Sequence, residues 1–146
     1  MNLETVDEAI DTYVNERLAN GEQKATERFL AYVYLKHRGD DLFEFLKKVR
    51  GLSRYYISFL GVMENPLRGP EIAFLASMIS VAIFSCYLMG HEESREVGIF
   101  VFAGTLVHAW SLLRMSAKKW LDIGVTIAIY REIVQLAEKE LQTAAS

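Results

Sequence analysis

The sequence predicts an all-α integral membrane protein built around a two-helix transmembrane hairpin. Residues 72–90 give nineteen positions without a charge, and residues 97–113 give seventeen more without a formal charge at neutral pH. At about 1.5 Å of rise per residue, each stretch makes a helix of roughly 26 to 28 Å, close to the ~30 Å hydrocarbon core of a bilayer. Helical spacing of apolar residues on both sides of the hairpin completes the predicted fold class.

Composition supports this prediction, because the chain is 51% hydrophobic and 24% charged, and nearly all of its charges lie outside the two apolar stretches. A helix that is apolar all round also occurs in the core of soluble proteins. A pair of core helices wrapped by the remaining chain is therefore the alternative. We expect three regions, a helical N-terminal region at 1–70, the hairpin at 71–113 and a C-terminal helix at 114–146.

Three short helices are expected in the N-terminal region, because apolar residues recur there three and four positions apart. They cover residues 3–20, 22–37 and 42–62. Gly21 and Gly39 end the first two, since glycine is a common stop at the end of a helix, and the third ends before Pro66 and Pro70.

The third of these helices carries a basic cluster, which consists of Lys47, Lys48, Arg50 and Arg54. A basic amphipathic helix just before a span can lie along the anionic inner leaflet of a membrane, so the cluster is predicted to contact the membrane surface. The alternative is an ordinary helix whose apolar face packs on its neighbours and whose basic side chains are solvated. The two readings are compatible.

The charges that flank the hairpin predict its orientation. Before the first span lie Lys47, Lys48, Arg50, Arg54 and Arg68, and after the second lie Arg114, Lys118 and Lys119. The connecting loop, residues 91–96, holds one arginine and three glutamates. The excess of Lys and Arg on the terminal sides predicts an integral inner or plasma membrane protein with both termini in the cytoplasm. The acidic N-terminus shows no cleavable signal peptide.

The second span is expected to continue into a long C-terminal helix, because apolar residues recur three and four apart along residues 113–141. This is the spacing of a coiled-coil seam. The seam predicted to mediate self-association consists of Trp120, Ile123, Ile127, Tyr130, Val134 and Leu141. A second apolar row, at 125, 129, 133 and 136, widens the face. The helix therefore offers either one face to copies of itself and another to the N-terminal helices, or one broad face to the N-terminal helices alone.

His108 is the only histidine inside the two predicted spans. An ionisable side chain at that depth is a candidate functional residue. In an antiparallel hairpin His108 lies at about the depth of Ser77, so it either hydrogen-bonds within the hairpin or has a role in lining a pore, sensing protons or contacting a ligand. Small residues that permit close helix contact accompany it, among them Ser80 and Gly104.

No phosphate-binding loop, nucleophile elbow or paired-histidine zinc motif is present in the sequence, so we expect no enzyme, no metal site and no cofactor. The net charge of -3 gives no reason to expect a nucleic acid partner. Two function classes remain. One is a small self-assembling membrane protein that acts as a pore, channel or membrane effector. The other is a non-catalytic adaptor that anchors a helical cytoplasmic platform for a partner protein.

Overall fold

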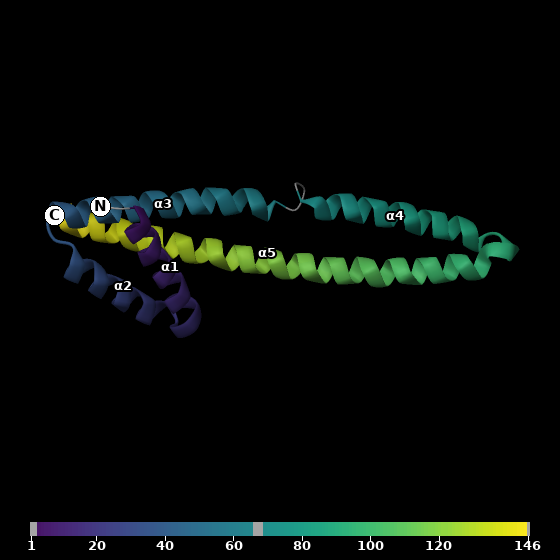
Figure 1. The fold of residues 1–146 in the computed structure, drawn as a ribbon, viewed down its shortest axis with the longest axis horizontal. Coiled ribbons are helices and arrows are strands. Elements are labelled where there is room, and N and C mark those ends of the chain that lie inside the picture. The colour runs from purple at the N-terminus through teal and green to yellow at the C-terminus, as the bar shows by residue number, and fades with distance from the viewer. Residues whose placement is uncertain (1–2, 66–68, 146) are drawn as a thin grey trace. The chain divides into compact units, whose positions relative to one another are not determined.

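The computed structural model describes residues 3–65 and 69–145, and every regular element in these ranges is a helix. In chain order they are α1 (Leu3–Asn20), α2 (Glu22–Lys36), α3 (Asp40–Glu64), α4 (Pro70–Met89), the 3-10 helix η2 (Glu92–Ser94) and α5 (Arg95–Ala145) (Figure 1). The all-α prediction is confirmed. Arg68, which contributes to the predicted orientation, lies outside the described residues.

The breaks between the N-terminal helices lie at the two glycines that are predicted to end helices. Gly21, with φ of 89°, separates α1 from α2, and Gly39, with φ of 58°, precedes α3. Both lie in the left-handed region, which residues with a Cβ atom rarely adopt, so each glycine fixes the turn at its position. The third helix is longer than expected, since α3 begins at Asp40 and continues to Glu64.

The chain forms two compact units. Unit 1 comprises residues 1–62 and 124–146, and unit 2 comprises residues 63–123. The long helix α5 is a single element of 51 residues that contributes to both units. The predicted continuation of the second apolar stretch into a C-terminal helix is therefore observed. Residues from 124 onward belong to the same unit as α1, α2 and most of α3.

Unit 1 has a conventional hydrophobic core between α1, α2, α3 and the C-terminal part of α5. Its buried members are Val6, Ala9, Ile10, Tyr13, Ala25, Phe29, Val33, Phe45, Leu46, Val49, Ile129, Ile133, Ala137 and Leu141. Polar bonds connect the helices around this core. Arg17 of α1 forms a two-pronged ion pair with Glu132 of α5, with Nε to Oε2 at 2.8 Å, and Arg54 of α3 pairs with Glu138 of α5 at 2.5 Å.

Unit 2 contains the antiparallel hairpin of α4 and the first part of α5, and its burial is inverted relative to unit 1. The buried residues are small: Ser85 is 0% exposed, and Gly98 and Ser116 are also buried. Large apolar side chains point outward, with Phe100 80% exposed. Two helices of the described chain, α4 and α5, are long and apolar enough to cross a membrane, and only 6% of the most apolar stretch of each is buried.

Gly98 lies at the closest approach of the two hairpin helices. A Cβ atom at this position would lie 2.8 Å from the backbone nitrogen of Met89 and 2.9 Å from the carbonyl oxygen of Ser85. Real Cβ atoms do not come this close to backbone, so only glycine permits the observed packing of α5 on α4.

Candidate functional site

The strongest candidate site is a groove on the hairpin, in unit 2, which we call the hairpin groove. It has a volume of about 320 Å³ and is lined by Ser77, Met78 and Val81 of α4 and by Val101, Gly104, Thr105 and His108 of α5. The groove lies open to the surroundings, because His108 and Gly104 are exposed and a Cβ atom built at Gly104 meets nothing within 4 Å. It is a polar opening in a largely apolar surface.

The hydroxyl groups of the groove are satisfied by their own helices. Ser77 Oγ donates to the carbonyl oxygen of Phe74 at 2.8 Å, and Thr105 Oγ1 donates to that of Val101 at 2.7 Å. Such bonds to a carbonyl three or four residues earlier are common for Ser and Thr in helices. The described residues make no hydrogen bond to the imidazole of His108 that would satisfy it within the hairpin.

The structure brings together three of the four residues expected to form this contact. Ser77, Gly104 and His108 line the same groove, which agrees with the equal depth expected for Ser77 and His108. Ser80 is not among the lining residues, and its hydroxyl donates to the carbonyl oxygen of Ala76 at 3.1 Å. Sequence reasoning missed Thr105, although Val101, Thr105 and His108 recur at the spacing of four and three that marks one helix face.

The other end of the hairpin is closed by an ion pair between α4 and α5. Lys119 Nζ lies 3.1 Å from Glu71 Oε1, beside a smaller groove of about 160 Å³ that includes Ser116 and Trp120. Charged side chains thus mark the end of the apolar surface of unit 2. This boundary agrees with the length expected of the two spans.

The predicted basic cluster is engaged with its own unit. Lys47 lies over the ring of Phe43 at 4.6 Å, and Lys48 pairs with Glu44 at 2.6 Å. Arg54 is bonded to Glu138 of α5, as described above. Arg50 is half-buried and lines an open groove with Lys47 and Glu138. Two of the four basic side chains, Lys48 and Arg54, are therefore paired with carboxylates, which weakens the attraction of the cluster for an anionic membrane.

The predicted seam on α5 divides between the two units. Trp120 and Ile123 lie in unit 2, where both are half-buried. In unit 1, Ile127 and Leu141 are buried within one copy of the chain, while Tyr130 and Val134 are half-buried. Ile129 and Ile133 of the second row fill the core together with Leu141. One broad face covered by the N-terminal helices therefore accounts for the pattern in unit 1.

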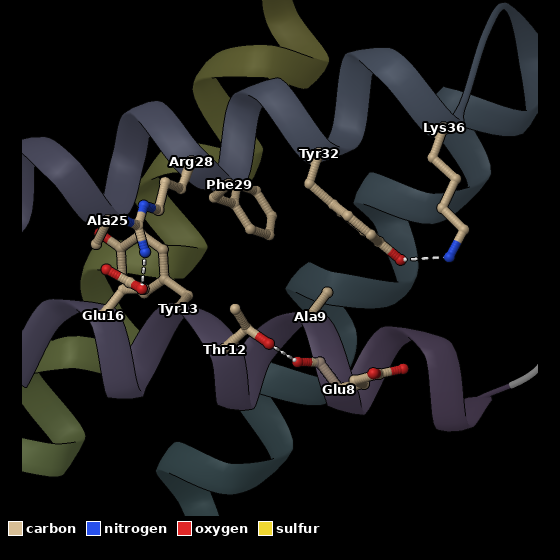
Figure 2. Close-up of a pocket in the computed structure, with 10 residues that line it drawn as sticks. All are labelled: Glu8, Ala9, Thr12, Tyr13, Glu16, Ala25, Arg28, Phe29, Tyr32 and Lys36. Atoms are coloured by element: carbon tan, nitrogen blue, oxygen red, sulfur yellow. Dashed lines mark hydrogen bonds and ion pairs between the residues drawn. The ribbon is translucent and has the colours of Figure 1, made fainter.

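A second hollow lies between α1 and α2 in unit 1, and we call it the α1–α2 cleft. It encloses about 130 Å³, close to the size of a cavity that accepts one small ring. Figure 2 shows its lining. The small side chains of Ala9 and Ala25 leave the space open, and the rings of Tyr13, Phe29 and Tyr32 lie around it. At its rim Arg28 pairs with Glu16, and Lys36 Nζ donates to the hydroxyl of Tyr32 at 3.1 Å.

Two polar groups in unit 1, the half-buried Tyr56 and the buried His37, are relevant to its chemistry. Tyr56 donates to Asp7 Oδ1 at 2.6 Å, and this bond, together with burial, raises the pKa of Tyr56 to about 12. His37 is buried against the ring of Phe45, with ring centroids 4.2 Å apart, and its Nδ1 lies 2.6 Å from Asp41 Oδ2. In the described ranges no group of three or more His, Cys, Asp or Glu side chains is placed to hold a metal ion.

Comparison with protein-family models, with curated proteins and with solved structures finds no match to this chain. The geometry of the hairpin groove and of the cleft is therefore the basis for a functional proposal.

Proposed function

We propose that the chain is a small two-span membrane protein that assembles with copies of itself and acts as a pore, channel or membrane effector. The observation that carries the proposal is the hairpin groove, a polar opening with an exposed imidazole on a hairpin whose remaining surface is largely apolar. The argument has two steps, insertion of the hairpin and association of hairpins.

Insertion is supported by the inverted burial of unit 2. In water, exposed Phe100, Val107 and Trp110 would be unfavourable, at about 1.5 to 3 kcal/mol for each large apolar side chain left uncovered. In a bilayer the same side chains face hydrocarbon, and small residues between the helices permit close packing. Ser85 and Gly98 occupy that position here. The hairpin therefore suits lipid as its solvent.

Association is supported by the position of His108. Ionisable side chains at the depth of a membrane almost always face other protein or a water-filled path, because contact with hydrocarbon is costly. A single hairpin leaves His108 exposed. Gly104 beside it lets another helix approach closely, since no atom stands in the way. Packing of several copies around this groove would place the imidazoles on a shared polar path.

The assembly is tested by replacing Gly104 with leucine. Gly104→Leu puts a large side chain into the hairpin groove at a position where a Cβ atom meets nothing within 4 Å, so we expect a folded monomer in place of a homo-oligomer. The measurement is the protein mass in mild detergent by light scattering. Ala103→Leu is the matched control, because Ala103 is exposed on the same helix and does not line the groove. An unchanged oligomer in Gly104→Leu contradicts association through the groove.

The pore is tested by ion flux through vesicles that contain the protein. His108→Ala should retain the oligomer and change the flux, since the side chain is proposed to line the path rather than to hold the copies together. Equal flux from the wild type and the variant would contradict a functional role for His108.

The proposed orientation places both termini in the cytoplasm, on the basis of the basic flanks and the acidic loop at η2. A cysteine at Ser94, in a Cys86→Ala background, should react with an impermeant thiol reagent added to intact cells. A cysteine at position 146 should not react. The opposite labelling pattern would reverse the orientation.

The alternative function is an adaptor that holds a helical platform at the membrane, and the α1–α2 cleft favours it. The cleft has an apolar floor and a charged rim, which is the layout of a small docking site for a protein side chain. A monomer in mild detergent that binds one defined partner with a fixed ratio would support this alternative over self-assembly.

A further inference from the structure

The C-terminal half of α3 carries a row of uncovered apolar side chains. Tyr55 is 63% exposed and Phe59 is 55% exposed, and Val62 and Met63 are exposed as well. Their spacing of four, three and one places them on one face of the helix. The core of unit 1 uses a different face of α3, which includes Val49. We call the uncovered set the α3 aromatic face.

The segment that carries this face is free of charge. Residues 55–63 contain no Asp, Glu, Lys or Arg, whereas Arg54 precedes them and Glu64 follows. The face begins with Tyr55, whose ring combines an apolar body with a polar hydroxyl group. Aromatic side chains of this kind collect at the boundary between lipid and water.

The position of the segment in the chain indicates what covers it. Helix α3 ends at Glu64 and α4, the first candidate span, begins at Pro70, so only residues 65–69 separate the two. A chain that enters a bilayer at α4 therefore reaches the surface of that bilayer within about two turns of the α3 aromatic face. By contrast, the basic cluster at 47–54 lies earlier in α3, and two of its members, Lys48 and Arg54, are paired with carboxylates of their own unit.

We propose that the α3 aromatic face lies in the interfacial layer of the membrane, and that its partner is the phospholipid surface. The inference rests on the proposed insertion of the hairpin. It assigns the lipid contact of α3 to an uncharged aromatic segment rather than to the basic cluster. Contact of this kind is driven by burial of apolar surface rather than by attraction to anionic headgroups, so it persists in neutral lipid and at high salt.

The test uses the full chain in vesicles of phosphatidylcholine with a fluorescent label at position 59. In a Cys86→Ala background, Phe59→Cys is labelled with an environment-sensitive dye, and lipids with a nitroxide near the headgroup or deep in the acyl chain serve as quenchers. We expect strong quenching by the headgroup-level nitroxide, weaker quenching by the deep one, and no change in high salt. Label at Tyr55→Cys should behave in the same way.

Two control positions separate this inference from the proposed function. Label at Val107→Cys, on the exposed face of α5, should be quenched by the deep nitroxide if the hairpin spans the bilayer. Label at Leu35→Cys, an exposed apolar residue of α2, should not be quenched. Quenching at 107 without quenching at 59 overturns the inference and leaves insertion intact. A label at 59 that is shielded from water but not quenched by lipid also overturns it, because protein then covers the face. Absence of quenching at 107 overturns insertion itself.

Discussion

Unit 1 and unit 2 are built from the same kind of amphipathic or apolar helix, but they bury opposite kinds of residue. In unit 1 the fully buried side chains are large and apolar, such as Phe45, Leu46 and Ile133. In unit 2 they are small, namely Ser85 and Gly98, and the large apolar side chains point away from the partner helix. This difference is the one expected if unit 1 packs in water and unit 2 packs in lipid, with α5 contributing to both units.

The largest expected effect comes from a charge in the core of unit 1. Ile133→Asp removes a fully buried aliphatic side chain and places a carboxylate without a partner there, so we expect a loss of more than about 3 kcal/mol and unfolding of unit 1. Helices α1 and α2 should become sensitive to protease in detergent solution, while the hairpin remains helical.

Gln135→Asp is the control for this prediction, because Gln135 is exposed on the same helix. It should leave the protease pattern unchanged. A stable Ile133→Asp protein would mean that the core of unit 1 contributes little to its stability, and the contrast between the two units would be lost.

A smaller effect is expected in unit 2 from a single methyl group at Gly98. Gly98→Ala places a Cβ atom against the backbone of Met89 and Ser85, which must move apart at a cost of about 1 to 3 kcal/mol. The measurement is resistance of the hairpin to denaturation by a harsh detergent. Gly104→Ala, where the space is empty, should match the wild type. Equal behaviour of the two alanine variants would show that close packing does not hold the hairpin.

The smallest effect is expected at high pH in unit 1. The hydrogen bond to Asp7 favours the protonated phenol of Tyr56, whose pKa of about 12 exceeds the usual value near 10. The stabilisation is therefore complete below about pH 10 and is lost as the pH rises through about 12.

Tyr56→Phe removes this bond, so the variant should lose about 1 kcal/mol at neutral pH and show a shallower loss of stability between about pH 10 and 12. Chemical denaturation of unit 1, followed by circular dichroism, measures both quantities. Identical slopes in that range would assign the pH dependence to other groups.

The ends of the helices and the similar depth of Ser77 and His108 could be predicted from the sequence for physical reasons. Helix ends at Gly21 and Gly39 follow from local backbone preference, and depth in an antiparallel hairpin follows from the rise per residue. The core-facing row of α5 was not predictable, because Ile129 and Ile133 belong to the second apolar row, and both rows have helical spacing. The close approach at Gly98 depends on how two helix backbones pack together, and the sequence pattern of a single helix does not contain that information.

The inverted burial of the hairpin also governs how freely its sequence can change. If the hairpin spans a membrane as proposed, exposed positions such as Phe100 and Val107 face lipid, so one apolar residue can replace another there with little effect on folding, whereas a polar one is excluded. At Gly98 the opposite constraint applies, because the volume of the side chain is limited there and its polarity is not. In related chains, side-chain size should therefore vary most on the outer face of the hairpin and least along the line where its two helices pack.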